Sequence, residues 1–282
     1  MIEKTAWDVR KYPEKFAAYC ILCNFAAVFQ NCINSMETKY IHRELSAVIE
    51  EAYRYFSVIT VTGPRQSGKT TLLRNLFSHL PYYSLENLDV RSFAENDPVA
   101  FLNQHTEGMI LDEVHNAPNL LSYIQGMVDN DADRRFILSG SSQFAMLKKV
   151  TQSLAGRTAV FELLPLSYSE IREQVTDTPL DNLLFNGFYP AIYSGRNIPK
   201  FLYPAYMKTY LDKDVRDLLQ IKDMMQFHTF IRLCAGRIGS LFKASELANE
   251  IGVSSHTVTA WLSVLQASYI VFLFREHTQT AD

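Results

Sequence analysis

The fold is decided by the stretch VITVTGPRQSGKTT at residues 58–71. An apolar, β-branched run that predicts a strand leads into a glycine-bounded loop, and the loop opens onto a pattern that predicts a helix. The loop matches the phosphate-binding pattern G-x-x-x-x-G-K-[ST] through Gly63, Gly68, Lys69 and Thr70, in the strand-then-helix context that the pattern requires. We therefore expect a loop that holds phosphate groups at the end of a central strand.

The residue types in this loop suit a triphosphate with a metal ion. Backbone N–H groups of such a loop point inward, and the next helix adds the positive end of its dipole. Lys69 supplies an ammonium for the β- and γ-phosphates, and the Thr70 hydroxyl is a hard oxygen ligand for Mg²⁺. Thr71 also suits a capping or packing role. The residues expected to bind the nucleotide are Gly63, Pro64, Arg65, Gln66, Ser67, Gly68, Lys69, Thr70 and Thr71.

Composition limits the classes of protein to consider. The chain has 282 residues, of which 48% are hydrophobic and 20% charged, with a formal net charge of -3. These values favour about two packed domains and give no support to a protein that coats nucleic acid. The four cysteines, Cys20, Cys23, Cys32 and Cys234, are too few for a disulfide framework, so we expect a reducing cytoplasm. Zinc binding at Cys20 and Cys23 is not expected because no second ligand pair follows.

Residues 1–35 differ from the rest of the chain because they contain the apolar run Phe16–Phe29 behind several basic residues. This run resembles the core of a signal peptide, but it is too short to span a membrane, Asn24 interrupts it, and no clear cleavage site follows. We expect that the natural protein begins at Met36, that the preceding residues are an over-extended gene start, and that the protein has no membrane partner.

From the lead-in helix at residues 37–55 to Pro165, helical and strand patterns alternate. Such alternation predicts an α/β fold, the doubly wound parallel sheet of a P-loop NTPase, with about five strands. We expect the phosphate-binding helix to run to about Leu80. The expected strands are 58–62, 82–85, 109–111, 135–138 and 159–164, and further helices are expected from Asp97 and over 118–130.

One strand pattern turns abruptly acidic, as a Walker B strand does. Met109–Leu111 is followed by Asp112 and Glu113. Because ligands lie at the carboxyl ends of parallel strands, we expect Asp112 to hold Mg²⁺ through its water shell. We expect Glu113 to polarise the attacking water as a general base. Two acids after a strand often mark only a solvated turn, and the complete phosphate-binding loop upstream is what favours the functional interpretation.

Two more positions are candidates for the site. Ser139 follows the fourth strand, where a hydroxyl can orient the lytic water or contact the γ-phosphate; a helix N-cap is the alternative. Arg157 precedes the fifth strand and is a candidate for neutralising transition-state charge, in cis or across a subunit interface. An ordinary surface arginine is the alternative there.

After Pro165 helical patterns replace strands. We expect helices over 203–221 and 223–237, then a helix-turn-helix over 244–265 with a strand at 269–274, which together predict a winged helix. Because the second helix has no lysine or arginine between residues 254 and 268, partner docking is favoured over DNA binding. The expected division is 1–35 extension, 36–166 P-loop domain, 167–238 helical region and 239–282 winged helix-turn-helix with a tail.

With these motifs, the chain resembles the prokaryotic AAA-type ATPases of the AAA+ superfamily that join a P-loop module to a winged helix and a C-terminal domain of unknown function. The resemblance covers roughly residues 39–274 and rests on TGPRQSGKTTL (62–72), LDE (111–113), LSGSS (138–142), LAGR (154–157), GFYP (187–190) and YLDKDV (210–215). It implies ATP and Mg²⁺ as ligands, with Lys69 and Thr70 on phosphate and metal. It also implies Asp112 and Glu113 as the Walker B pair and Arg157 as a nucleotide-sensing arginine.

The chain departs from this family at two places. His115 stands where such proteins often have a glutamine. The sequence also stops soon after Phe274, where relatives continue into a nuclease-like domain, so we expect a truncated product.

The leading functional hypothesis is a Mg²⁺-dependent ATPase whose cycle moves the helical and winged-helix part against the P-loop domain, alone, as a homo-oligomer or with a protein partner. The alternative is a nucleotide-dependent switch that binds DNA or a protein and turns over rarely. Glu113 favours the ATPase, because a switch needs no positioned base. A small-molecule kinase would need an acceptor pocket that no motif indicates, and GTP is disfavoured because the Asn-Lys-x-Asp pattern is absent.

Overall fold

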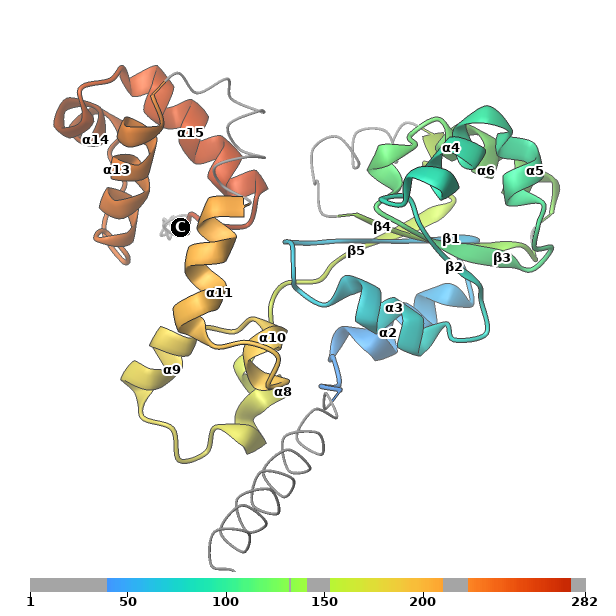
Figure 1. The fold of residues 1–282 in the computed structure, drawn as a ribbon, viewed down its shortest axis with the longest axis horizontal. Helices are drawn as coiled ribbons and strands as arrows, with labels where there is room; N and C mark the ends of the chain where they lie inside the picture. The colour runs from blue at the N-terminus through green and yellow to red at the C-terminus, as the bar shows by residue number, and fades with distance from the viewer. Residues whose placement is uncertain (1–39, 132, 141–152, 210–222, 275–282) are drawn as a thin grey trace, which may run out of the picture.

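The computed structural model describes residues 40–131, 133–140, 153–209 and 223–274. They form a P-loop part (residues 40–162) and a helical part (residues 163–274), which lie side by side and are joined after β5 (Figure 1). In chain order, the elements of the P-loop part are α2 (Leu45–Tyr53), β1 (Val58–Thr62), α3 (Lys69–Leu76), β2 (Tyr82–Ser84), α4 (Leu88–Asn96), α5 (Pro98–Leu102), β3 (Gly108–Asp112), a 3-10 turn (Val114–Asn116), α6 (Leu120–Asn130), β4 (Arg135–Gly140) and β5 (Thr158–Glu162).

The five strands form one parallel sheet in the order β2-β3-β4-β1-β5, which confirms the predicted α/β class and strand count. α2 and α3 cover one face, and α4, α5 and α6 cover the other (Figure 1). Alternating residues of β3 serve the two faces: Met109 and Leu111 pack with α5 and α6, whereas Ile110 packs with α2 and α3. Because both faces are covered, β1 and β3 are buried along their whole length.

Helix boundaries follow local capping. Asp97 accepts a hydrogen bond from Ala100 N and Pro98 stands in the first turn of α5, as the sequence predicts. α4, whose first turn is capped by Asn87, was not predicted from the sequence. The phosphate-binding helix α3 ends at Leu76 rather than near Leu80, because the chain turns there before Pro81.

The helical part begins with a capping box, in which Ser167 and Glu170 satisfy each other's backbone N–H groups. The helix predicted to begin at residue 203 begins earlier, since α11 starts at Pro199 and contains Pro204. The charged residues at 210–217 that the same prediction included lie outside the described residues. The elements are α8 (Tyr168–Ile171), a 3-10 turn (Arg172–Gln174), α9 (Leu180–Asn186), α10 (Pro190–Tyr193), α11 (Pro199–Tyr206), α13 (Met224–Ala235), α14 (Ala244–Ile251) and α15 (Ser255–Ala267).

α14 and α15 form the predicted helix-turn-helix around Gly252, whose φ of 80° suits a residue without a side chain. Together with α13 they enclose a separate core that includes Phe227, Phe230 and Trp261. The predicted wing is wrong, because residues 269–274 form no strand. The N–H groups of Ile270 and Val271 donate to Leu265 O at the end of α15, so they cap that helix instead of entering a ladder. No described helix is long and apolar enough to cross a membrane.

Candidate functional site

The loop between β1 and α3 has the backbone of a phosphate cradle. Its φ angles are 143° at Gly63, 64° at Gln66 and 96° at Gly68, which lie in the region that favours glycine. A side chain at Gly63 does not fit, since its Cβ would lie 2.2 Å from the Leu163 carbonyl oxygen. The two motif glycines are therefore required by the backbone itself.

Lys69 lies inside this loop. Its Nζ donates to Gly63 O at 2.9 Å and to Pro64 O at 2.8 Å, and the residue is 5% exposed. Burial lowers the pKa of Lys69 to about 8, although the nearby Glu113 and Asp112 carboxylates oppose the shift. A bound phosphate would raise the pKa of Lys69, because a nearby anion stabilises the charged ammonium.

Asp112 ends β3 beside the loop and accepts hydrogen bonds from several directions. Thr70 Oγ1 donates to Oδ2 at 2.7 Å, and the buried Ser139 hydroxyl donates to Oδ1. Tyr82 OH also donates to Oδ2, at 2.8 Å. Thr70 and Asp112, the two predicted metal residues, are thus in direct contact and present hydroxyl and carboxylate oxygens, which suit Mg²⁺.

Two of these contacts differ from the sequence prediction. Ser139 is fully buried and its hydroxyl donates to Asp112, so it orients that carboxylate; the predicted sensor role at the γ-phosphate stays a prediction. Tyr82 was missed, because a tyrosine in a strand is usually read as core. Burial and the hydrogen bond to Asp112 raise the pKa of Tyr82 above its usual range, so its hydroxyl remains a donor. Ser141 and Ser142, the last residues of the LSGSS motif, lie outside the described residues.

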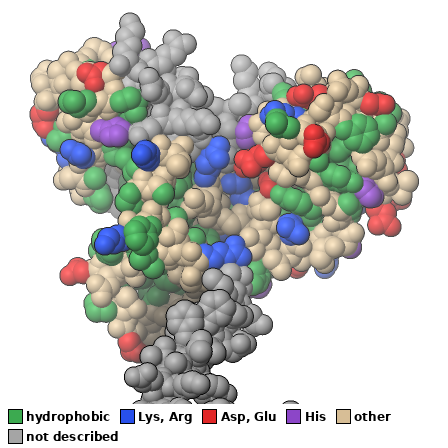
Figure 2. Space-filling model, in the orientation of Figure 1, with side chains coloured by type: hydrophobic (Ala, Val, Ile, Leu, Met, Phe, Trp, Pro, Cys, Tyr) green, Lys and Arg blue, Asp and Glu red, His purple; other side chains and the backbone are tan. Residues whose placement is uncertain are grey.

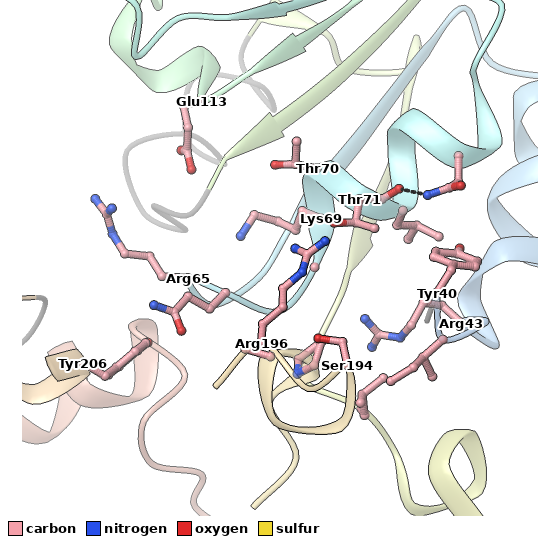
Figure 3. A pocket seen from close by; sticks show the side chains of 18 of the residues that line it. Tyr40, Arg43, Arg65, Lys69, Thr70, Thr71, Glu113, Ser194, Arg196 and Tyr206 are labelled. Carbon is pink, nitrogen blue, oxygen red and sulfur yellow. Dashed lines mark hydrogen bonds between the residues drawn. The ribbon is translucent and has the colours of Figure 1, made fainter. Parts of the chain in front are cut away.

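Glu113 leaves β3 with a left-handed backbone, at φ 53° and ψ 46°, which is costly for a non-glycine residue. This turn directs its side chain toward Arg65 and Lys69 (Figure 3). His115 Nδ1 lies 3.1 Å from Glu113 Oε2, and the two side chains are 24% and 15% exposed. The structure therefore brings the predicted base, the predicted cradle and the predicted metal residues together at the carboxyl edge of the sheet.

A cavity of about 790 Å³ opens beside the P-loop, within the size range of small-molecule sites. Cationic side chains on its wall come from Arg43, Arg65, Lys69 and Arg196, against one acid, Glu113. Lys and Arg side chains also line the hollow between the two parts in Figure 2. Apolar wall residues are Tyr40, Ile41, Leu72, Leu166, Pro190 and Ala191. The wall therefore combines positive charge, which suits a polyanion, with an apolar portion.

The helical part supplies one side of this cavity. Arg196, in the loop between α10 and α11, extends toward Lys69 and Thr71 (Figure 3). The preceding turn, Gly187–Pro190, is one of the motifs quoted from the sequence, whereas Arg196 was not predicted. Arg196 could have been proposed from the sequence, because it is a basic residue that follows the GFYP motif of the family resemblance by six positions.

One buried polar atom supports the fit of phosphate to the loop. The Ser67 hydroxyl is inaccessible to solvent and has no hydrogen-bond partner among the described residues. A buried hydroxyl without a partner is costly unless a ligand satisfies it. The backbone angles, the buried Lys69 and this hydroxyl together fit a phosphate group.

Arg157 lies at the opposite edge of the sheet. Its carbonyl accepts from Val58 N at the beginning of β1, and β1 extends about 13 Å from there to the P-loop. Its guanidinium binds Asp129 through two hydrogen bonds, of 2.5 and 2.9 Å. The role in cis is therefore wrong, because the chain's own nucleotide site lies at the other end of the strand. A role across a subunit interface stays a prediction.

The helix-turn-helix lacks free basic charge where DNA backbone contacts would need it. Arg237 pairs with Glu250, and Lys243 pairs with Glu246 at 2.8 Å. His256, in the first turn of α15, is the sole basic residue type between 254 and 268. Partner docking through these helices stays a prediction.

Two family models match successive parts of the chain. Residues 55–172 match the model of an AAA domain, and residues 177–281 match a domain of unknown function. The boundary between them falls after α8, between residues 172 and 177 and before α9.

Similar proteins include an uncharacterised protein of Mycobacterium tuberculosis, 29% identical over 238 residues, which cover 81% of this chain and 52% of that protein. An uncharacterised protein of Methanocaldococcus jannaschii is 23% identical over 246 residues, covering 76% of this chain and 55% of that protein. The chain thus spans about half the length of the curated relatives it matches.

Among solved structures, the Walker-type ATPase PABY2304 of Pyrococcus abyssi superimposes with a TM-score of 0.55 at 14% identity, covering 82% of this chain and 91% of that chain. At this identity the likeness concerns the fold. It agrees with the parallel sheet and the phosphate-binding loop of this chain. Residues 55–172 therefore match an AAA domain and have the fold of a P-loop NTPase, and the chain continues into a region that matches a domain of unknown function.

Proposed function

We propose that this chain binds ATP with Mg²⁺ and hydrolyses the bond between the β- and γ-phosphates, which releases ADP and inorganic phosphate, in a cycle that moves the helical part against the P-loop part. The observation that carries the proposal is the convergence on one cavity wall of Lys69, Thr70 and Glu113, with Asp112 in contact with Thr70. Each group has the chemistry that phosphoryl transfer to water requires.

The residues have separate roles in this proposal. The loop N–H groups and Lys69 bind the phosphates, while Thr70 and Asp112 hold the metal, Asp112 through water. Tyr82 and Ser139 fix the orientation of Asp112. Glu113 accepts a proton from the attacking water. Bound Mg²⁺ would supply charge neutralisation at the phosphate oxygens.

Coupling to movement is supported by the composition of the cavity wall. Arg196, Pro190 and Tyr206 belong to the helical part, whereas the cradle belongs to the P-loop part. A nucleotide held between two such walls binds more tightly when they approach, so its hydrolysis changes their preferred separation.

A nucleotide-dependent switch with little turnover is the second candidate. The contact between Glu113 Oε2 and His115 Nδ1 favours it, because a carboxylate held by a neighbour is less available to water. The ion pairs on the helix-turn-helix favour a protein over DNA as the partner of such a switch.

Binding of Mg²⁺-ATP and steady-state hydrolysis, measured on the full chain beside Lys69→Ala, test the proposal. We expect the wild-type chain to bind and hydrolyse ATP and the variant to do neither, because the variant lacks the phosphate-binding cation. Lys243→Ala is the matched control, since that lysine is exposed and pairs with Glu246 away from the cavity. Binding without turnover would select the switch, and absence of binding by the wild-type chain would overturn the proposal.

A further inference from the structure

Arg43 is a buried arginine that ties three segments of the chain together. It lies ahead of α2, is 5% exposed, and lines the cavity at the P-loop (Figure 3). Its Nη1 donates to Ser67 O at 2.8 Å, inside the phosphate-binding loop. Its Nη2 donates to Leu164 O at 2.7 Å and to Pro165 O at 3.3 Å, in the segment that leads out of β5.

The remaining donor completes the fixation of the guanidinium. Arg43 Nε donates to Glu170 Oε1 at 3.0 Å, and the two side chains are 7% and 5% exposed. Glu170 also accepts from Glu44 N at 2.9 Å and from Ser167 N at 2.8 Å. A planar guanidinium held by oxygens on several sides has one orientation, and it presents Nη1 to the P-loop in that orientation.

The hydrogen bond to Ser67 O has a consequence for the next N–H group. In a planar trans peptide the C=O and the N–H point in opposite directions. With the Ser67 carbonyl turned toward Arg43, the Gly68 N–H points to the other side of the loop backbone. In loops of this motif the inner side is where phosphate oxygens bind.

This peptide needs an external donor to hold it. Gly68 has a φ of 96° and no side chain, so rotation of the peptide between Ser67 and Gly68 meets little steric resistance. A rotated peptide would present a carbonyl oxygen, rather than an N–H, to the phosphates. The Arg43 guanidinium opposes that rotation directly.

We propose that Arg43 is a positioning residue that holds the Ser67–Gly68 peptide in the phosphate-binding orientation. Because Arg43 also binds Glu170 and the Leu164 carbonyl, that orientation depends on the position of the helical part relative to the P-loop part. This inference rests on the proposed nucleotide binding and extends it to the connection between the two parts. Arg43 lines the cavity but acts through the loop backbone, because its donors are taken by Ser67 O, by Glu170 Oε1 and by the carbonyls of residues 164 and 165.

Arg43→Lys tests the positioning role because it keeps the positive charge and loses the planar set of donors. We expect its affinities for Mg²⁺-ATP and for inorganic pyrophosphate to fall together, by about tenfold or more, as loss of a preorganised hydrogen bond to a charged ligand would produce. Isothermal titration calorimetry on the full chain measures both affinities, with a non-hydrolysable ATP analogue in place of ATP so that no turnover occurs.

Arg134→Lys is the matched control. Arg134 is 8% exposed and donates to Asn103 Oδ1, Leu102 O and His105 O, but it precedes β4 at the edge of the sheet away from the P-loop. Both variants should lower the thermal unfolding midpoint, whereas only Arg43→Lys should weaken the two ligands. Glu170→Gln, which leaves Arg43 in place, should also lower the affinities for Mg²⁺-ATP and pyrophosphate, but by a smaller factor than Arg43→Lys.

The outcomes separate this inference from the proposed function. Absence of ATP binding by the wild-type chain would overturn both. Binding by the wild-type chain with equal affinities in Arg43→Lys and Arg134→Lys would overturn the positioning role alone. If Arg43→Lys does not fold, unchanged pyrophosphate affinity in Glu170→Gln would overturn the dependence on the helical part.

Discussion

The carboxyl and amino edges of the sheet have similar charged side chains in different surroundings. At the carboxyl edge, Lys69 and Asp112 are each 5% exposed and lie among loop carbonyls and hydroxyl groups. At the amino edge, the side chains of Arg157 and Asp129 are 33% and 44% exposed and satisfy each other. Buried charged groups with polar neighbours have the shifted pKa values typical of functional sites, whereas water screens an exposed ion pair, which contributes little to stability.

The difference also appears in the ionisation of the groups. Burial lowers the pKa of Lys69 to about 8, so its charge responds to what binds beside it. At the other edge, the hydrogen bonds from Arg157 lower the pKa of Asp129 and keep that pair ionised. The residue types alone therefore do not identify a site, and the direction of the strands decides which pair meets the ligand.

Glu113→Gln should give the largest effect at the carboxyl edge. We expect ATP binding to persist while hydrolysis falls by about 10²-fold or more, because the amide cannot accept the proton from water. Single-turnover hydrolysis beside equilibrium binding measures the two quantities. Asp129→Asn, at the amino edge, is the control and should keep both; equal losses in the two variants would remove the distinction between the edges.

Lys69→Met should show a pH-dependent difference in stability from the wild type. The Lys69 pKa is about 8 in the folded protein and has an ordinary value of 10.5. Between these values the unfolded chain binds a proton that the folded chain has lost, so the free energy of unfolding of the wild type should rise with pH relative to Lys69→Met. Below pH 8 the difference should be constant.

Urea unfolding without nucleotide or Mg²⁺, at several pH values from 7 to 10.5, measures this difference. A difference that stays flat across the whole range would mean that burial does not shift the pKa of Lys69.

Arg157→Ala should give the smallest effect. Its ion pair with Asp129 is exposed and lies away from the cavity, so we expect unchanged ATP affinity and little change in the unfolding midpoint. Turnover should be measured over a range of protein concentrations. A loss that appears only where the chain self-associates would support the role across a subunit interface, and a loss of ATP affinity in dilute protein would contradict the placement at the amino edge.

Much of the P-loop part could be predicted because its signals are local. The alternation of strand and helix patterns predicted the parallel sheet. The positions of Lys69, Thr70, Asp112 and Glu113 after two of its strands predicted that they lie at one edge. The position of Arg157 could have been predicted as well, since a residue just before a parallel strand lies at the amino edge. The wing was wrong because an apolar run such as 269–274 favours a strand only where a partner strand exists.

The remaining site residues depend on contacts that periodicity does not report. Arg43 meets Glu170 across 127 positions of sequence, and Tyr82 meets Asp112 across 30. Arg196 reaches the cavity because the helical part folds back against the P-loop. A sequence pattern indicates which face of an element is apolar, but not which distant polar group will lie opposite it.

The position of β1 in the sheet has a consequence for synthesis on the ribosome. β1 emerges first among the strands, yet its partners are β4 and β5, with Val58 beside Phe136 and Thr158. At ordinary elongation rates β1 waits on the order of ten seconds for β5. A nascent chain that stops before Leu163 also lacks the carbonyl that closes over Gly63, so the cradle is completed late, after its own motif has long left the exit tunnel.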